Sequence, residues 1–291
     1  MKITLPPATT NTESNLLKQA QVFALCYNPL VDHLLVPPLD CPVLDKAHST
    51  DYLDRCRRGA NGFGPPDYRK VSHAEFSSSA MMIAAHAALA GFHDGVKCAF
   101  APVSGFHHAG HNFGGGYCTF NGLMVAAIEM RDLGVARRIL IMDGDAHYGN
   151  GTDDIIHELK LEKYVTNVPM ARPGGKNWRG LMERDLAAYD LVLYQAGADA
   201  HRADPYGAGY LSDGDWIARD MFVFRMCKDA GVPIVWNLAG GYNGNKTIDL
   251  HTSTFQTACE IFYPNEDARD IDRADQMFPD LPHEHEGRFR P

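Results

Sequence analysis

The sequence of 291 residues lacks the features that mark several large classes of protein. No apolar run is long enough to span a bilayer, and residues 1–16 lack the apolar core of a secretory signal, so we expect no membrane partner. Basic residues are in deficit, with 27 Lys and Arg against 36 Asp and Glu, and the net charge of −9 argues against a nucleic-acid partner. The seven cysteines form no CxxC pair, which argues against a zinc ribbon or a disulfide framework. Together these absences predict a cytoplasmic protein.

Apolar runs and helical patterns alternate along the chain, and no segment repeats. Strands are expected at 21–27, 97–104, 137–143, 163–169, 190–199 and 233–239, and helices at 48–58, 72–89, 121–134, 151–159, 178–189, 216–229 and 247–263. A capping box at Ser72 and Glu75 predicts the start of the second helix. The alternation predicts an α/β fold, with one doubly wound, mainly parallel sheet and helices on both faces. We expect a single domain over residues 1–291, with a flexible lead-in at about 1–16 and a C-terminal extension at about 264–291.

The segment 139–151 gives the strongest single indication of chemistry. It begins as an unbroken apolar run, which is typical of a strand buried on both faces of a parallel sheet. Asp143, Asp145 and His147 then follow at alternate positions, so in an extended chain their side chains leave on one side, beyond the carboxyl end of the strand. Two carboxylates and an imidazole in such a place favour a divalent metal. The alternative is an acidic turn followed by a capped helix.

Three further strand ends carry polar residues that apolar strands do not require. They are the pair His107 and His108, then Asp199, and then Tyr242 after two glycines. Because the carboxyl ends of parallel strands lie at one edge of a sheet, all these side chains can meet. Together they would supply acids and an imidazole for a metal, two imidazoles for proton transfer, and a phenol beside a flexible Gly-Gly pair.

With these motifs in place, the chain resembles the zinc-dependent histone deacetylase superfamily, which includes bacterial acetylpolyamine amidohydrolases and has an arginase-like α/β fold. The resemblance extends over roughly residues 21 to 263, in the order of the family. It is carried by six short motifs: Gly105-Phe-His-His-Ala-Gly110, Gly116-Tyr-Cys-Thr-Phe-Asn121, Asp143-Gly-Asp-Ala-His-Tyr-Gly-Asn-Gly-Thr152, Gly197-Ala-Asp-Ala200, Asp204-Pro-Tyr-Gly207 and Gly240-Gly-Tyr242.

The resemblance implies that one zinc ion is bound by three residues: Asp145, His147 and Asp199. Three protein ligands leave positions for water and for a substrate carbonyl, and zinc lowers the pKa of bound water toward roughly 7. His108 would be the general base, which then protonates the leaving amine. His107 would be its electrostatic neighbour, paired with Asp143 in a His–carboxylate dyad that fixes the tautomer of the imidazole.

The resemblance also implies how the substrate is held. Tyr242 would donate its hydroxyl to the carbonyl oxygen as this becomes an oxyanion, and the alternative for this residue is a buried phenol that closes the sheet. Gly116 and Tyr117 stand where the family lines one wall of an acyl-lysine tunnel. The family also binds a structural potassium ion, mainly through backbone carbonyls of the segment 143–147. The expected reaction removes an acetyl or another acyl group from a lysine-like or polyamine amine, with a small molecule or an acyl-lysine as substrate.

The sequence departs from the pattern of the family at several positions. An extra Phe106 precedes the histidine pair. Asn150 stands where some branches have an aspartate partner for the second histidine, and a neutral partner is expected to leave His108 less basic. The interval between the second and third zinc ligands is shorter than in the family, which predicts a more open pocket or one completed by a second subunit of a homo-oligomer. Trp178 is a candidate for the second tunnel aromatic.

Two other functions remain open at this point. An arginase-type hydrolase with two manganese ions would use the same fold, but its chemistry needs a further carboxylate two residues after the histidine ligand, where this chain has Gly149. A catalytically silent protein that retained the metal site is the second alternative. Against it, every position matched to a catalytic role keeps a competent residue.

Overall fold

A seven-stranded parallel sheet forms the centre of the computed structural model, which describes residues 2–4, 21–22, 32–34, 40–59, 68–91, 98–172, 175–176, 185–207 and 209–263. The strand order is β2-β1-β3-β9-β8-β4-β5, and all the pairings in this sheet are parallel. The strands are β1 (Lys2–Thr4), β2 (Asp32–Leu34), β3 (Cys98–Ala101), β4 (Ile139–Asp143), β5 (Val165–Pro169), β8 (Leu191–Ala196) and β9 (Ile234–Leu238). A separate antiparallel pair consists of β6 (Ala171–Arg172) and β7 (Gly175–Lys176).

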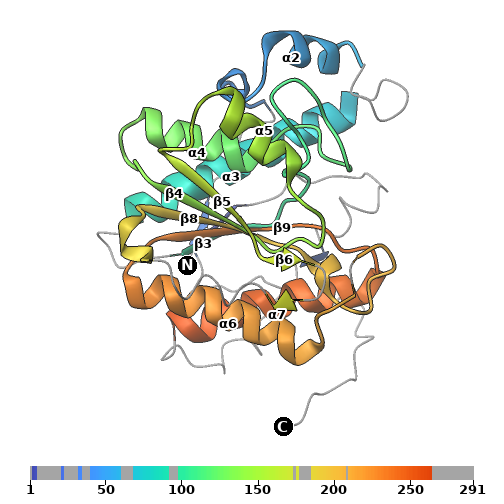
Figure 1. Cartoon of the computed structure of the whole chain (residues 1–291), viewed down its shortest axis with the longest axis vertical. Coiled ribbons are helices and arrows are strands. Elements are labelled where there is room, and N and C mark those ends of the chain that lie inside the picture. The colour runs from blue at the N-terminus through green and yellow to red at the C-terminus, as the bar shows by residue number, and fades with distance from the viewer. Residues whose placement is uncertain are drawn as a thin grey trace.

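Helices cover both faces of this sheet (Figure 1). One face carries α2 (Thr50–Arg57), α3 (Tyr68–Ala90), α4 (Gly122–Asp132) and α5 (Asn150–Glu158), and the other carries α6 (Asp213–Ala230) and α7 (Gly244–Phe262). The described residues also form the short 3-10 helices η1 (Leu44–Lys46), η4 (Leu186–Ala188) and η5 (Ala198–Ala200). This arrangement confirms the predicted doubly wound α/β fold. Among the described residues, no helix combines the length and the hydropathy needed to cross a bilayer.

Strand β4 shows how the sequence pattern produces two separate cores. All five of its residues are buried, as the unbroken apolar run predicted. Ile139 and Ile141 pack in the core on the side of α3 and α4, whereas Leu140 and Met142 pack in the core on the side of α6 and α7. Alternate side chains of a strand point to opposite faces, so one strand contributes to both cores. Burial of each such side chain stabilises the fold by about 1.5–3 kcal/mol.

Several predicted elements differ from the structure. The second helix begins at Tyr68 rather than at the predicted capping box, because the preceding residues continue the helix and place Ser72 inside it. Gln21 and Val22 are helical, not the start of a strand, since periodicity does not separate short apolar strands from helices. Of the helix predicted at 178–189, residues 178–184 lie outside the described part, and the described remainder holds only the single turn of η4.

The ends of the chain also differ from expectation. Lys2–Thr4, within the predicted flexible lead-in, forms strand β1 of the sheet. The rest of residues 1–16, the predicted extension at 264–291 and Trp178 lie outside the described residues. The single-domain prediction for 1–291 therefore stays a prediction.

The connections that follow the adjacent strands β4 and β8 run to opposite faces of the sheet. After β4 the chain continues into α5 on one face, and after β8 it continues into α6 on the other face (Figure 1). The loops that leave these adjacent strands separate from each other at their carboxyl ends, and open α/β sheets bind their ligands at such a place. The fold therefore directs attention to the residues that follow β4 and β8.

Candidate active site

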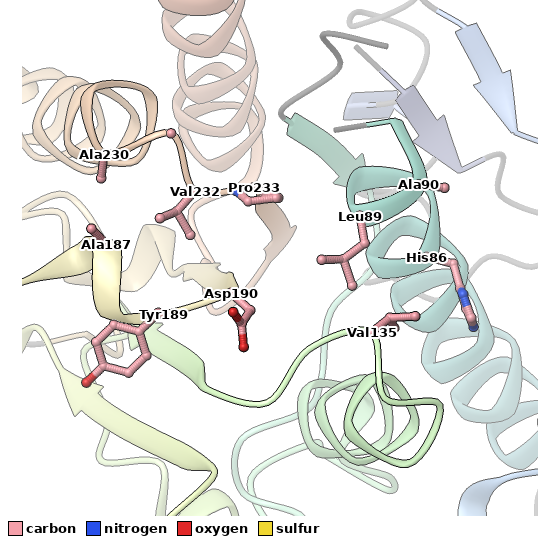
Figure 2. Close-up of a pocket in the computed structure, with 11 residues that line it drawn as sticks. His86, Leu89, Ala90, Val135, Ala187, Tyr189, Asp190, Ala230, Val232 and Pro233 are labelled. Atoms are coloured by element: carbon pink, nitrogen blue, oxygen red, sulfur yellow. The ribbon is translucent and has the colours of Figure 1, made fainter. Parts of the chain in front are cut away.

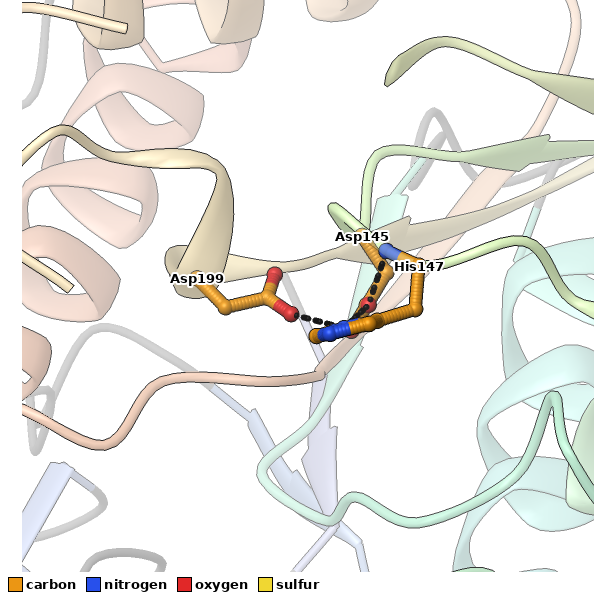
Figure 3. Close-up of side chains that lie close together, drawn as sticks. All are labelled: Asp145, His147 and Asp199. Carbon is orange, nitrogen blue, oxygen red and sulfur yellow. Dashed lines mark hydrogen bonds and ion pairs between the residues drawn. The ribbon is translucent and has the colours of Figure 1, made fainter. Parts of the chain in front are cut away.

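Three potential metal ligands converge beyond the carboxyl ends of β4 and β8 (Figure 3). Asp145 and His147 come from the loop after β4, and Asp199 lies in η5 after β8. Their ligand atoms all lie within 4.8 Å of one another. The Nδ1 atom of His147 faces both carboxylates, at 2.8 Å from Asp199 Oδ2 and 3.2 Å from Asp145 Oδ1. The fold thus gathers the three side chains that the family resemblance assigned to zinc.

The charges of this group indicate that a cation belongs among them. Hydrogen bonds to Asp145 and Asp199 raise the pKa of His147 to about 10. Burial and the neighbouring Asp145 carboxylate raise the pKa of Asp199. Burial opposes the ionisation of Asp145, but His107 and the hydrogen bonds of His147 outweigh it and lower the pKa. In the metal-free group His147 and Asp199 therefore hold protons while Asp145 is ionised, and a metal ion attracted by the two carboxylates would displace those protons.

The space around the two carboxylates also fits a small cation. Each is held by the backbone, since Gly240 N donates to Asp145 Oδ2 at 2.8 Å and Ala146 N donates to Asp199 Oδ1 at 2.9 Å. A Cβ on Gly240 would lie 2.5 Å from Asp199 Oδ2 and 2.8 Å from Asp145 Oδ2. Glycine at position 240 therefore leaves open the space between the Asp145 and Asp199 carboxylates, which any larger residue would fill. Two carboxylates and one imidazole form a donor set that zinc accepts in catalytic sites.

The position where a second metal would need its ligand is closed. A Cβ on Gly149 would lie 2.6 Å from Asp143 Oδ2 and 3.2 Å from His107 Cβ, so the space for a larger side chain is already filled. Within the part of the chain that the structure describes, Asp145, His147 and Asp199 form the one group of three potential ligands. The described geometry therefore offers a site for one metal ion.

The two predicted catalytic histidines lie beside the metal group. His107 Nδ1 is 2.8 Å from Asp143 Oδ2, and its Nε2 is 3.7 Å from Asp145 Oδ1. His108 Nδ1 is 2.6 Å from Asn150 Oδ1. The two imidazole rings have centroids 4.0 Å apart, and the ring of His108 is 6.2 Å from that of His147. The inserted Phe106 is buried against the start of α4 and leaves both histidine–partner pairs intact.

The partners of the two histidines move their pKa values in opposite directions. Burial opposes a charge on His107, but the carboxylates of Asp143 and Asp145 outweigh it and raise the pKa to about 9. Burial lowers the pKa of His108, and the adjacent His107 lowers it further. The Asn150 oxygen accepts a hydrogen bond from His108 Nδ1, which leaves Nε2 as the free base. Two adjacent imidazoles thus differ in charge, as an acid–base pair requires.

The backbone of the histidine pair is held by donors from distant parts of the chain. The carbonyl of His107 accepts from the N–H groups of Gly151 and Thr152 at the start of α5, at 2.9 and 3.1 Å. Asn121 Nδ2 donates to the Ala109 carbonyl at 3.0 Å. His48 Nδ1 donates to the Gly110 carbonyl at 2.8 Å, and its Nε2 accepts from the N–H of Asn121 at 2.9 Å. Sequence reasoning missed His48 and Asn121, because their partners lie far away along the chain.

Three tyrosine rings from separate loops lie close together. The ring centroid of Tyr242 lies 6.2 Å from that of Tyr117 and 5.4 Å from that of Tyr206. Tyr117 and Tyr206 are 73% and 72% exposed, so their ring faces are open to a ligand. Burial raises the pKa of Tyr242, and the carboxylates of Asp145 and Asp199 raise it further, which keeps its hydroxyl protonated.

Tyr117 reaches this position through an unusual turn. Gly115 and Cys118 exchange backbone hydrogen bonds of 3.1 and 2.7 Å around Gly116 and Tyr117. Both central residues have positive φ, 47° and 64°, as in a type I′ turn. A Cβ on Gly116 would lie 2.2 Å from Cδ2 of His108, so the glycine allows the turn to pack on the ring of that histidine.

Asp204 joins the two loops that carry Tyr206 and Tyr242. Its Oδ1 accepts from the N–H groups of Tyr206 and Gly207 at 2.9 and 3.0 Å, and its Oδ2 accepts from the N–H of Tyr242 at 2.6 Å. This carboxylate therefore fixes the backbone of Tyr242. The Asp-Pro-Tyr-Gly motif drew attention in the sequence, but the role of its aspartate did not emerge from the pattern.

A separate pocket of about 530 Å³ lies at the opposite edge of the sheet (Figure 2). It is lined by Val135 and Pro233, which precede β4 and β9, and by His86, Tyr189 and Asp190 among others. None of the residues of the candidate active site lines it. His86 is exposed at this pocket.

Comparisons with known proteins identify related sequences and a related structure. An uncharacterized protein of Picosynechococcus sp. is 30% identical over 193 residues, which is 58% of this chain and 64% of that protein. Acetylpolyamine amidohydrolase 1 of Pseudomonas aeruginosa is 27% identical over 171 residues, 47% of this chain and 48% of that protein. The matches thus span less than two thirds of these curated relatives. The crystal structure of the HDA15 HD domain shares the fold, with a TM-score of 0.71 and 18% identity over 96% of this chain and 97% of that one.

The family model of the histone deacetylase domain matches residues 15–168, more than half of the chain. The matched range includes the histidine pair, Asp145 and His147, and it ends before Asp199 and Tyr242. The geometry above places Asp199 in contact with the matched residues. The chain therefore belongs to the histone deacetylase domain family.

Proposed function

We propose that the protein is a zinc-dependent amidohydrolase that removes an acetyl or related acyl group from a lysine-like or polyamine amine. The observation that carries this proposal is the convergence of Asp145, His147 and Asp199 within 4.8 Å, beside an imidazole that is held neutral. Relatives named histone deacetylases and acetylpolyamine amidohydrolases support the hydrolase class. In this proposal the three residues hold zinc, which supplies Lewis acidity that polarises the substrate carbonyl and acidifies water.

His108 provides the acid–base chemistry in this proposal. Its neutral state leaves Nε2 free to accept a proton from the attacking water and to return it to the leaving amine. His107, kept positive by Asp143, stabilises negative charge that develops next to it. The hydroxyl of Tyr242 donates to the carbonyl oxygen as this becomes negative, and its raised pKa keeps the proton available.

The exposed tyrosines beside Tyr242 support a cationic substrate. The exposed ring faces of Tyr117 and Tyr206 flank Tyr242, and a cation placed over such a face is attracted by about 0.5–2 kcal/mol. Acylated polyamines keep at least one positively charged ammonium group beyond the amide. An acyl-lysine residue has only the neutral peptide backbone there. This difference favours an acylated polyamine, and the net charge of −9 agrees with it.

The test is a substrate panel run with a stoichiometric zinc complex of the full chain. N-acetylated polyamines, acetyl-lysine peptides and a trifluoroacetyl-lysine amide are compared by kcat/KM, each with the metal present and after its removal by a chelator. The proposal predicts chelator-sensitive release of the acyl group, with polyamines preferred. Hydrolysis of a guanidine substrate with two bound manganese ions would favour the arginase-type alternative. Zinc binding without turnover of any amide would favour the silent protein.

A further inference from the structure

Helix α6 places a charged pair on the face that packs against the sheet. Its buried residues recur at helical spacing: Trp216, Arg219, Asp220, Val223, Phe224 and Cys227. Arg219 is only 1% exposed and Asp220 is fully buried. Buried charges are costly, and they persist where each one is paired and hydrogen-bonded.

The carboxylate of this pair is satisfied by its surroundings. Asp220 accepts hydrogen bonds from Arg219 Nε, from the hydroxyl of Tyr194 and from the hydroxyl of Thr254. The guanidinium lies with its central carbon 3.8 Å from the ring centroid of Trp216. The aspartate and the indole thus fix both the position and the orientation of the arginine side chain.

The outer end of the guanidinium contacts the two loops that carry the potential metal ligands. Arg219 Nη1 donates to the carbonyl of Gly144 and to the carbonyl of Gly197, both at 3.2 Å. Gly144 directly precedes Asp145, and Gly197 lies two residues before Asp199. The loop after β4 also contacts strand β8 directly, since Gly144 N donates to the Gln195 carbonyl at 2.9 Å. One cationic group therefore links the backbones that carry both carboxylate ligands.

We infer that Arg219 is a positioning residue that sets the spacing of the Asp145 and Asp199 carboxylates and thereby the affinity of the site for zinc. It contacts neither the ligand side chains nor the substrate, and it acts through the carbonyls of Gly144 and Gly197. A planar, permanently charged group with several donors suits this task, because it can hold two carbonyls at fixed geometry. The inference rests on the proposed zinc site and goes beyond the reaction itself.

The test measures zinc affinity by competition with a chromophoric chelator on the full chain. Arg219→Met should weaken zinc binding by about 10- to 100-fold, the usual effect of removing a group that orients metal ligands. Arg219→Lys keeps the charge but presents a single nitrogen on a flexible stem, so about a 10-fold loss is expected. The visible spectrum of the cobalt-substituted protein should change in both variants, because it reports ligand geometry rather than stability.

Val223→Ala is the matched control. Val223 is fully buried on the same face of α6, and its side chain makes no hydrogen bond, so its truncation lowers stability without releasing either loop. The melting temperature of this control should be reduced about as much as that of Arg219→Met. Its zinc affinity and its cobalt spectrum should nevertheless match those of the wild type. Equal losses of affinity in Val223→Ala and Arg219→Met would overturn the inference, because stability alone would then explain them.

Arg219→Lys decides the question if Arg219→Met does not fold, and a zinc Kd within twofold of wild type in that variant would overturn the inference. If the wild-type chain binds no zinc, the proposed function fails instead. The two failures are therefore distinguishable in one set of titrations.

Discussion

Replacement of Gly240 by alanine should displace the carboxylates of the candidate metal site and weaken zinc binding. A Cβ at this position would lie 2.5 Å from Asp199 Oδ2, whereas ordinary van der Waals contact begins at 3.4 Å, so the carboxylate must move by 3.4 − 2.5 = 0.9 Å. Asp199 is fully buried, which leaves it little room to move. Zinc–ligand distances in proteins stay within about 0.2 Å of their usual values, so a carboxylate displaced this far should bind zinc at least about 10-fold more weakly.

The assay for Gly240→Ala combines zinc titration with kcat/KM on the best amide substrate at saturating zinc. A misplacement of about 1 Å at a catalytic centre can cost about 100-fold in rate, and we expect a loss of that order. Gly214→Ala is the control, because nothing lies within 4 Å of its Cβ on the exposed first turn of α6. A Gly240→Ala variant with zinc Kd and kcat/KM both within twofold of wild type would refute the assignment of the metal site to the space between Asp145 and Asp199.

Three further predictions follow from individual side chains. Tyr242→Phe should keep zinc and lower kcat by about 10²–10³-fold, as loss of an oxyanion donor does; turnover near the wild-type rate would remove that role. Asp145→Ala and Asp199→Ala should each empty the site, and stoichiometric zinc in both purified variants would contradict the ligand assignment. Burial lowers the pKa of His48 to about 4, below about 6.5 in the unfolded chain, so acid protonates the unfolded chain first. As the pH falls from 6.5 to 4, this should lower the free energy of unfolding by about 3 kcal/mol. In His48→Gln, the free energy of unfolding from urea titrations should fall less steeply over the same pH range.

The features that the sequence predicted are those set by short-range patterns. The apolar run of β4 specified a strand buried on both faces, because residues at successive positions had to serve two cores. The meeting of the polar strand ends followed from a single rule, that parallel strands end at one edge of the sheet, and the family resemblance selected Asp145, His147 and Asp199 among them. Once the alternation of strands and helices was recognised, the approximate location of the site followed.

The features that the sequence did not predict depend on contacts between distant residues. His48 holds Gly110 and Asn121, which are 62 and 73 residues away, and no local pattern marks such a pairing. Arg219 lies in phase with the apolar face of α6, and a charge at that position was the one available indication of a buried role. Its targets are backbone carbonyls, which carry no sequence information.

The type I′ turn at Gly116 and Tyr117 has a consequence for how this protein can change. A residue with a side chain in the left-handed region costs about 1–2 kcal/mol relative to glycine, and Tyr117 bears this cost while most of its ring faces water. If Tyr117 binds a cationic substrate, as proposed above, selection for heat resistance and selection for recognition of that substrate act in opposite directions at this one residue. Variants chosen for thermal endurance alone would tend to exchange the tyrosine for glycine or asparagine and become less selective.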